Sequence, residues 1–467
     1  MTPATESALG SLCAAGLPEH DAREWSESFP ITTGEFGSDA REYGAFWRRS
    51  ASLLGRLPAK SRRNDAERAA AEALLSDAHA SRESFLAAHV EQVYDRLTER
   101  GSTFRRLDDL VYAAAKLVRG LVPTRHEVDA EAAHRQGDKD GAEIDQGLFL
   151  AHVLSRPRIG EHLCHAMLLP RPESATLIAE FAERGSLDLG AARLTRRGKA
   201  AHLEMINPRF LNAEDDTTLA QTELAVDVAT LDRTTEIAVM RGVAVDNEKY
   251  RGKRIFGAGI NLTHLYLGKI PFLWFLIRDL GYVHKLLRGV ASPESVPDDV
   301  NGRGVEKLWI AAVDTFAIGG HCQALLCMDY VLAASDAFLT LPARKEGIIP
   351  GFANLRLPRF VGDRIARQAI LYERRLKCDS PEGRLICDEI APAAEMDAAV
   401  DRVVDGLTSA GAVSAIGNRR AFRVGQEPLD LFRRYASVYA REQAYCHFSP
   451  ALIANLERNW DAKNRKV

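Results

Sequence analysis

The chain has few cysteines, and their spacing favours neither disulfides nor metal binding. Its 467 residues include seven cysteines, and no two of them form a CxxC pair. A disulfide framework uses an even set of cysteines, and a structural zinc site needs clustered thiols or imidazoles. The sequence therefore indicates neither feature and predicts a reduced compartment, the cytoplasm.

Long apolar runs and a strong excess of one charge are also missing. No stretch of about 18 apolar residues occurs, and no basic segment followed by an apolar one stands at the start. The formal net charge of -3 argues against general nucleic-acid binding. We therefore predict a globular protein that binds neither membranes nor nucleic acid.

Motifs for the common cofactors are absent as well. The sequence has no HExxH and no two-histidine, one-carboxylate spacing typical of iron sites. Gly257 and Gly259 begin a GxGxxG pattern, but its third glycine is missing. These absences predict a protein without a metal site or a dinucleotide cofactor.

The first part of the chain has helical periodicity. Between Leu107 and Leu121, apolar residues follow the i, i+3, i+4, i+7 spacing of a buried helix face, and Pro123 follows them. The highly charged segment 127–143 predicts an exposed loop. We expect an all-α N-terminal domain over residues 1–185.

From residue 186 the pattern changes to strands that alternate with helices. Two short apolar stretches within 192–206 flank Gly198, which predicts a β-hairpin. Further strands are predicted at 236–240, 254–256, 308–313 and 330–333, with helices near 272–287 and from 322 onward. Such alternation predicts an α/β core with mainly parallel strands over residues 186–395. Helical patterns at 364–371, 396–407 and 429–444 follow, and we assign residues 396–467 to a C-terminal helical region.

Two glycine-bearing turns carry the clearest sign of chemistry. Gly257–Asn261 follows the predicted strand 254–256, and Gly319–Gln323 follows the predicted strand 308–313. Turns of small residues can aim two main-chain N–H groups at one oxygen, and such an oxyanion hole stabilises charge developing on a carbonyl. A glycine after a strand is usually only a turn, so the pair counts for more than either turn alone.

The two turns and their flanking segments resemble the crotonase (enoyl-CoA hydratase/isomerase) superfamily, whose members bind acyl-CoA thioesters and stabilise their enolates. The hairpin, Asn207-Pro208 and Leu211-Asn212-Ala213 also match the start of a crotonase core. The resemblance implies a crotonase-like core of stacked ββα turns, with the N–H groups of Ile260 and Gly320 as oxyanion donors. It also implies a homo-oligomer, a trimer or a dimer of trimers, whose interface is built by the C-terminal helices.

The two glutamates of the superfamily's hydratases are missing. Their positions, three residues after the second oxyanion glycine and about seven before a Pro-Gly, hold Gln323 and Ala343 in this chain. Neither side chain exchanges a proton at neutral pH. Glu346 lies three residues beyond Ala343. Ordinary hydration of a double bond is therefore not predicted.

These departures, with the long helical N-terminal segment, resemble an oxygenase branch of the superfamily that needs neither metal nor organic cofactor. Its substrates are an arylacetyl-CoA thioester and O2, and the thioester enolate itself reduces O2. The resemblance places Gln323 beside O2 as a catalytic residue. It places in the substrate pocket Glu214, Arg278, Ala258, Gly259, Asn261, His321 and Cys322.

Several of these residues have other interpretations. Glu214 begins an acidic stretch that also suits the first turn of a helix. Arg278 follows a strongly apolar run, where an arginine needs a partner. His321 and Cys322 favour packing or positioning over nucleophilic roles.

Basic residues before the first glycine turn are candidates for holding the CoA phosphates. The basic candidates are Arg209, Lys249, Lys253 and Arg254, and Tyr250 is a further candidate for contacting CoA. A solvated loop is the alternative interpretation of this cluster.

Two other functions stay open from the sequence. One is a crotonase-type hydratase or isomerase that uses Glu346 or Glu214 as its base, and this enzyme would work equally well without O2. The other is an acyl-CoA-binding scaffold whose catalytic groups have been lost and whose helices organise pathway partners. A Gln323→Ala protein that binds CoA esters as tightly as the wild type but turns over far more slowly would count against a scaffold.

Overall fold

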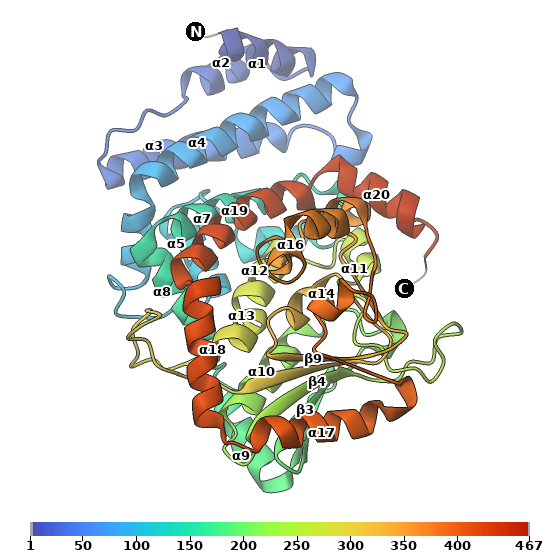
Figure 1. The fold of residues 1–467 in the computed structure, drawn as a ribbon. Helices are drawn as coiled ribbons and strands as arrows, with labels where there is room; N and C mark the ends of the chain where they lie inside the picture. Colours follow the sequence, from blue (N-terminus) through green and yellow to red (C-terminus); the bar gives the residue numbers. More distant parts are fainter. Residues whose placement is uncertain (1–2, 466–467) are drawn as a thin grey trace. The chain divides into compact units, whose positions relative to one another are not determined.

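In the computed structural model, which describes residues 3–465, the chain is helical up to the first strand. The helices are α1 (Pro3–Ala14), α2 (Glu19–Glu27), α3 (Phe36–Leu54), α4 (Asp65–Leu97), α5 (Leu107–Leu117), α6 (Arg125–Glu131), α7 (Ile144–Ser155), α8 (Pro157–Leu168) and α9 (Ser174–Arg184), with 3-10 turns η1 (Lys60–Arg62) and η2 (Gln136–Asp138). This confirms the predicted helical character of the N-terminal region. Figure 1 shows α3 and α4 side by side.

Local signals explain where these helices begin and which face they bury. Asn64 accepts a hydrogen bond from the N–H of Glu67, whose carboxylate accepts the N–H of Asn64, so a capping box starts α4. The apolar residues of α5 are buried as their spacing predicts, Leu107 and Leu110 among them. A periodic apolar face was therefore sufficient to find this helix.

The expectation of an exposed loop at 127–143 is confirmed only in part: residues 132–135 are exposed and irregular, but other parts are helical or buried. Part of it belongs to α6, and Lys139 and Glu143 are buried. Lys139 Nζ donates to the carbonyl of Gly268 (2.9 Å), and the N–H of Phe272 donates to the Glu143 carboxylate (2.6 Å). The partners of these charged groups lie far along the chain, and no local pattern reveals them.

The chain folds into two compact units. The first contains the chain up to Leu163 with Tyr266–Leu273 and Ala436–Ile453, and the second contains Cys164–Leu265, Trp274–Tyr435 and the chain from Ala454 onward. Each unit is therefore assembled from segments that are distant in sequence. All residues of the candidate site described below belong to the second unit.

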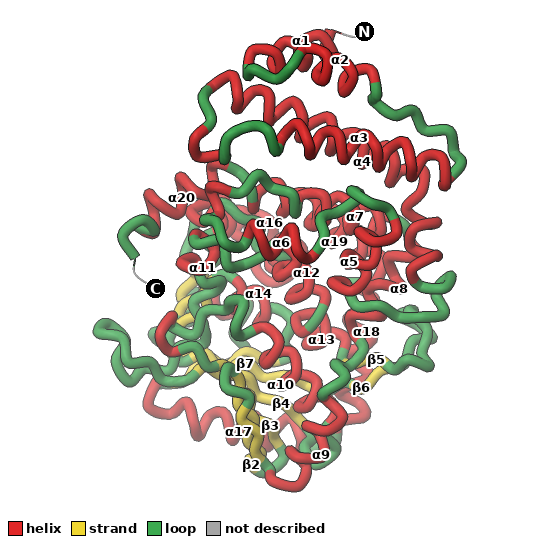
Figure 2. Tube along the Cα trace, turned by 180° about the vertical axis from the view of Figure 1, so that it is seen from behind, coloured by secondary structure: helices red, strands yellow, loops and turns green. Residues whose placement is uncertain are grey.

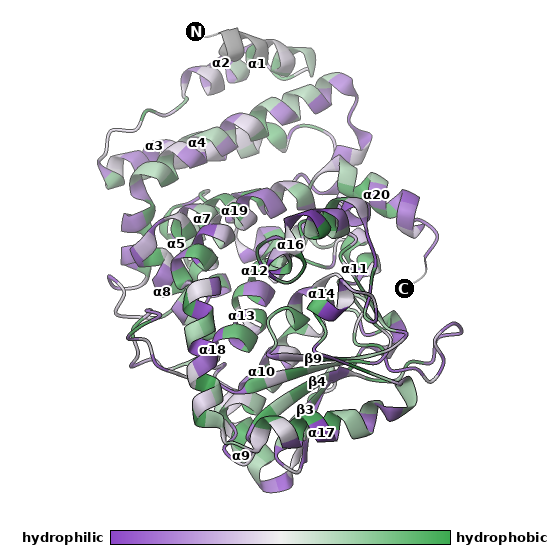
Figure 3. Ribbon diagram, viewed as in Figure 1, coloured by the Kyte–Doolittle hydropathy of each residue, from purple (hydrophilic) through white to green (hydrophobic). Residues whose placement is uncertain are grey.

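The main sheet of the second unit has the strand order β1-β2-β3-β4-β7-β9-β12. Its strands are β1 (Ser186–Asp188), β2 (Ala192–Arg197), β3 (Ala200–Met205), β4 (Ile237–Gly242), β7 (Leu308–Val313), β9 (Tyr330–Ala334) and β12 (Glu389–Ala391). Strands β1 to β3 pair antiparallel, and all pairs from β3 to β12 are parallel, which confirms the predicted hairpin and the mainly parallel core. Figure 2 shows the strands in yellow, and Figure 3 colours them as largely hydrophobic.

Smaller strands and further helices complete the second part of the chain. Strands β8 (Phe316–Ile318), β10 (Phe338–Thr340) and β11 (Leu376–Lys377) form a separate sheet, and β5 (Val290–Ala291) pairs with β6 (Gly304–Val305). The helices are α10 (Leu219–Leu231), α11 (Leu262–Tyr266), α12 (Phe272–Leu280), α13 (Tyr282–Arg288), α14 (Gly320–Leu325), α15 (Ala343–Glu346), α16 (Ala353–Tyr372), α17 (Met396–Thr408), α18 (Ala412–Gln426), α19 (Leu429–His447) and α20 (Pro450–Trp460), with the 3-10 turns η3 (Pro208–Phe210), η4 (Gly383–Leu385) and η5 (Ala393–Glu395). The predicted C-terminal helices are confirmed. Among the described residues, the structure has no helix with the length and apolar character that a bilayer crossing needs.

Two predicted elements differ in detail. The expected strand 254–256 makes only isolated bridges, because the carbonyl of Ile255 accepts from the Asn212 side chain (2.8 Å) instead of a neighbouring strand. The expected helix 272–287 is divided at Gly281, which leaves helical geometry with φ -87° and ψ -113°. The first difference arises from a tertiary contact near the candidate site.

Candidate active site

The two glycine turns lie side by side, as an oxyanion hole requires. Gly257 forms a parallel bridge with Ala317, and its carbonyl accepts the N–H of Ile318 (3.0 Å). Gly259 has φ +80°, a conformation that favours glycine, and a Cβ placed on it would lie 3.4 Å from the nitrogen of Gly320. The fold therefore brings together two turns that are far apart in the sequence.

Both proposed donors are left unused by the main chain. On either side of Ile260, the carbonyl of Gly259 accepts from Glu214 N–H (2.8 Å) and Asn261 N–H donates to the carbonyl of Glu214 (2.7 Å). Gly320 is the first residue of α14, a position whose N–H has no partner inside a helix. Within residues 3–465, neither N–H donates to a main-chain oxygen, so both are available to an oxyanion.

His321 fixes the position of the first turn. Its Nδ1 accepts the N–H of Gly259 (3.2 Å), and its ring covers Gly257 so closely that a Cβ there would lie 2.2 Å from ring carbons. Burial lowers the pKa of His321 to about 4, so the ring is neutral near pH 7 and accepts at Nδ1. His321 is therefore a positioning residue and not an acid or base.

Arg278 connects three of the predicted site residues. Its Nε donates to both carboxylate oxygens of Glu214 (2.9 and 3.0 Å), and Nη1 donates to Gln323 Oε1 (3.0 Å). Its Nη2 donates to the carbonyl of Gly320 (2.6 Å), at the second oxyanion turn. The partner that an arginine in an apolar run needs is therefore Glu214, and the network extends to the turn itself.

The environment of Glu214 keeps this carboxylate ionised. Burial alone would raise its pKa, but the charge of Arg278 and the hydrogen bonds from Arg278 and the Tyr282 hydroxyl hold the pKa of Glu214 below its usual value. Burial raises the pKa of Tyr282 well above its usual value, so its hydroxyl stays a donor. A carboxylate with occupied lone pairs and a lowered pKa is a poor proton acceptor.

A cavity of about 650 Å³ opens beside the first turn. Three predicted residues of that turn line it, Ala258, Ile260 and Asn261, and so does Glu346 on α15. The residues of the Arg278 network do not line the cavity; they are packed at the turn that carries Gly320.

The remaining predicted substrate residues have structural roles. Asn261 Oδ1 accepts the N–H groups of Thr263 and His264 (3.2 Å each), so Asn261 caps α11. Cys322 lies in the hydrophobic core, where burial raises the pKa of its thiol to about 12. The uncharged thiol agrees with the packing role expected of it.

Only some of the predicted CoA-binding residues reach the cavity. Arg209 and Tyr250 line it, whereas Lys249, Lys253 and Arg254 do not, and Arg254 instead pairs with Glu204 (2.8 Å). Three cavity-lining cations were missed, Lys345, Arg375 and Arg465. They come from separate elements, and nothing in the local sequence distinguishes them from ordinary surface charges.

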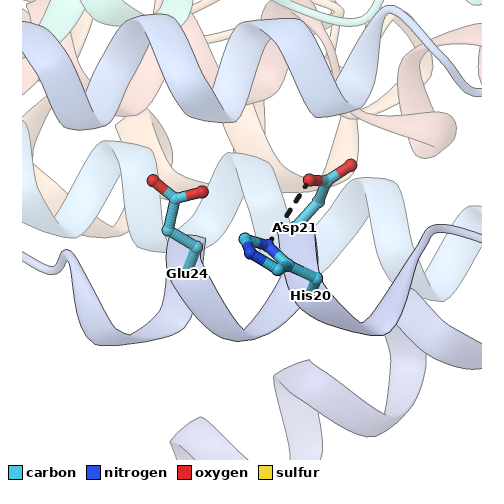
Figure 4. Close-up of side chains that lie close together, drawn as sticks. All are labelled: His20, Asp21 and Glu24. Carbon is cyan, nitrogen blue, oxygen red and sulfur yellow. Dashed lines mark ion pairs between the residues drawn. The ribbon is translucent and has the colours of Figure 1, made fainter.

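Two groups of side chains have the composition of metal ligands. His20, Asp21 and Glu24 lie on α2, and Figure 4 shows His20 beside Asp21. The ring nitrogen Nδ1 of His20 lies 3.9 Å from the Asp21 carboxylate. In the other group, Asp215 accepts from Asn261 (2.9 Å) and His264 pairs with Asp216 (2.7 Å). Hydrogen bonds and ion pairs account for both groups, and we assign no metal to either.

The paired turns over a mainly parallel core define the class of the protein. The chain belongs to the enoyl-CoA hydratase/isomerase (crotonase) family, whose model, "Enoyl-CoA hydratase/isomerase", matches residues 302–418. A relative covering most of the chain is the (3,5-dihydroxyphenyl)acetyl-CoA 1,2-dioxygenase of Amycolatopsis orientalis, which is 46% identical over 409 residues, 87% of this chain and 93% of that protein. This confirms the resemblance seen in the sequence.

Other relatives cover about half of the chain. The crotonyl-CoA hydratase of Syntrophomonas wolfei is 25% identical over 236 residues, 50% of this chain and 82% of that protein. A solved enoyl-CoA hydratase of Mycobacterium avium subsp. paratuberculosis is 21% identical, covers 58% of this chain and 98% of its own, and has a TM-score of 0.46.

Proposed function

We propose that the protein is a metal- and cofactor-independent dioxygenase that converts 3,5-dihydroxyphenylacetyl-CoA and O2 to 3,5-dihydroxyphenylglyoxylate and CoA. The supporting observation is that the turns carrying Ile260 and Gly320 lie side by side, with Ile260 lining the cavity, in a chain 46% identical to a relative named for this reaction. The hydratase glutamates are replaced by Gln323 and Ala343, which disfavours hydration.

The first task of the site is to stabilise an enolate. The aryl group and the thioester both acidify the α-CH2, and its deprotonation places negative charge on the thioester oxygen. The N–H groups of Ile260 and Gly320 are preorganised for that charge, and one such donor contributes about 3 kcal/mol. The protein also orients the anion and excludes water that would reprotonate it.

The second task is to direct the reaction of this anion with O2. The electron-rich enolate reduces O2 and forms a peroxide on the α-carbon. The peroxide attacks the thioester carbonyl and the C–S bond breaks, which releases CoA. The O–O bond then breaks as the second α-C–H bond loses its proton, which leaves a keto group on the α-carbon of the arylglyoxylate. Both oxygen atoms enter the acid, and the two α-hydrogens end on the acid and the thiol, so no external reductant is needed.

Gln323 suits the step in which the peroxide forms. Its Oε1 accepts from Arg278 (3.0 Å), which fixes the amide and leaves its NH2 group to donate. An amide donor stabilises a peroxide oxygen without supplying a proton that would quench the enolate. This orientation favours a catalytic glutamine over the glutamate of a hydratase.

The decisive measurement is O2 uptake by metal-stripped protein. With 3,5-dihydroxyphenylacetyl-CoA under air, we expect O2 consumption equal to CoA release, and under nitrogen no CoA release. An oxygen electrode and a thiol reagent measure the two quantities. Equal turnover under nitrogen would instead identify a hydratase or isomerase, and tight thioester binding without any turnover would identify a scaffold.

The cations at the cavity are proposed to hold the CoA phosphates. Replacing Arg209 by Met is expected to raise KM about tenfold with kcat unchanged, because the lost phosphate contact serves substrate and transition state equally. Steady-state O2 uptake measures both constants. The matched variant Arg367→Met removes a 61% exposed arginine of α16, outside the cavity, and should leave KM unchanged. A lowered kcat in Arg209→Met would contradict a pure binding role.

A homo-oligomer, a trimer or a dimer of trimers, is also proposed, with residues 396–467 contributing its interface. In support, α18 exposes the apolar side chains of Val413, Phe422 and Val424. A cytoplasmic location and a place in making dihydroxyphenylglycine for glycopeptide antibiotics follow from the family resemblance and stay predictions.

A further inference from the structure

Glu346 places a second carboxylate at the oxyanion turns. A Cβ built on Gly319 would lie 3.9 Å from Glu346 Oε1, and Gly319 directly precedes the residue that supplies the second donor. The same cavity is lined by Ile260, which supplies the first donor. The Glu346 carboxylate therefore lies next to the space where a thioester bound by both N–H groups would place its α-carbon.

The position of Glu346 on α15 explains how a carboxylate reaches this space despite the missing hydratase glutamate. Ala343 and Glu346 are the first and last residues of α15, three positions apart. Residues at i and i+3 lie on one face of a helix. The three-residue displacement of Glu346 from the hydratase position therefore moves the carboxylate by about one turn along the same helix face. Glu346 still lines the cavity.

Glu346 and Glu214 differ in how their oxygens are used. Glu214 accepts from Arg278 and Tyr282. In the part of the chain whose side chains are described, the Glu346 carboxylate has neither a hydrogen bond nor an ion pair, although it is only 8% exposed. Carboxylates whose environments drive their pKa values apart mark separate roles: one fixed in the ionised form, the other free to exchange a proton.

The charges around Glu346 suit a base at neutral pH. Burial, and then the nearby charge of Glu373, raise the pKa of Glu346 to about 7. Glu373 itself pairs with Lys345 (2.6 Å), and the other cations of the cavity are Arg209, Arg375 and Arg465. General bases work best when their pKa lies near the working pH.

We infer that Glu346 is the base that removes the α-proton of the bound thioester, an inference that rests on the proposed dioxygenase function. The α-C–H bond breaks, its electron pair enters the enolate held by Ile260 and Gly320, and the proton moves to a Glu346 oxygen. The proton later leaves with the departing CoA sulfur, so the carboxylate is regenerated in each cycle. Glu346 is thus assigned as a catalytic residue, and Glu214 stays the ionised partner of Arg278.

Hydrogen exchange under nitrogen isolates this step from the reaction with O2. In D2O, the wild type should exchange the α-hydrogens of 3,5-dihydroxyphenylacetyl-CoA, followed by NMR. Glu346→Gln, which keeps the shape of the side chain, should exchange and consume O2 at least about a hundredfold more slowly, with unchanged thioester binding. Glu346→Asp keeps a carboxylate and should exchange faster than Glu346→Gln, which separates loss of the base from misfolding.

The pH profile gives a readout that a structural role would not produce. The ionised form of Glu346 is the active one, so exchange should fall as pH drops through about 7. The matched variant Glu373→Gln removes a carboxylate of the same cavity and leaves Lys345 without its partner. Both changes lower the pKa of Glu346, so Glu373→Gln should still exchange, with its midpoint at lower pH.

The possible outcomes separate the two proposals. Wild-type exchange rates in folded Glu346→Gln overturn the assignment of Glu346, and O2 consumption by the wild type then leaves the dioxygenase function intact. Exchange that depends on Glu346 without any O2 consumption overturns the dioxygenase function and supports an isomerase that uses this base.

Discussion

Gly257→Ala should lower kcat at least about a hundredfold, the loss expected when one oxyanion donor is removed. A Cβ at this position would lie 2.2 Å from carbons of the His321 ring. The ring is 1% exposed and its Nδ1 holds the N–H of Gly259, so relieving the overlap displaces the turn that carries the Ile260 donor. O2 uptake at saturating thioester measures kcat.

A glycine without such a neighbour provides the control for this prediction. Gly406 lies inside α17, and no atom comes within 4 Å of a Cβ built there. Gly406→Ala should keep wild-type kcat and gain up to about 1 kcal/mol of stability from helix propensity. If folded Gly257→Ala also retained wild-type kcat, the first turn would not be part of an oxyanion hole.

Arg278→Met should reduce the free energy of unfolding by about 3–5 kcal/mol, because it leaves the buried carboxylate of Glu214 without its cation. The arginine bonds to Glu214 at 2.9 and 3.0 Å and to Asp279 at 2.5 Å, and all three residues are buried. Urea or guanidinium unfolding measures the loss. A change below about 1 kcal/mol, typical of exposed ion pairs, would contradict this account of the network.

The loss of unfolding free energy in Arg278→Met should grow as pH rises. In the wild type, the lowered pKa of Glu214 contributes stability above the pKa of the unfolded chain, and this contribution disappears as pH falls through the folded pKa. Without Arg278, burial raises the pKa of Glu214 instead. The ionised, unpaired carboxylate then destabilises the folded variant more as pH rises. The deficit of Arg278→Met should therefore increase between about pH 4 and pH 7.

Two further variants test the charge explanation. Arg278→Lys keeps a positive charge but cannot reproduce the planar fork that contacts Glu214, Gln323 and Gly320, so its stability should be intermediate. The double variant Glu214→Gln/Arg278→Met, which removes both charges, should lose less unfolding free energy than Arg278→Met alone. In the double variant no ionised carboxylate is left buried at position 214. Simple additivity of the two substitutions would count against a direct pair.

Features with a local signature could be predicted from the sequence. The apolar spacing located α5, Gly198 located the hairpin, and the glycine pattern located the two turns that the fold brings together. Each signal depends on nearby residues, since helix faces, tight turns and close backbone approach restrict residue types within a few positions.

Features that depend on distant contacts could not be predicted. The partner of Arg278 and the burial of Lys139 and Glu143 are set by segments far along the chain. The cavity position of Glu346 depends on α15 being one helical turn, and an alignment of motif positions treats this residue as displaced. Residue type alone does not distinguish a buried charge with a partner from a solvated one.

The bond from Arg278 Nη2 to the carbonyl of Gly320 limits how substrate preference can change by mutation. A substitution at Glu214 also frees the arginine that bonds to the turn carrying Gly320. A single substitution at position 214 or 278 should therefore lower turnover before the enzyme accepts a new substrate. A change of substrate preference would need substitutions at both positions. Libraries that vary positions 214 and 278 together should yield altered catalysts that one-at-a-time scanning misses.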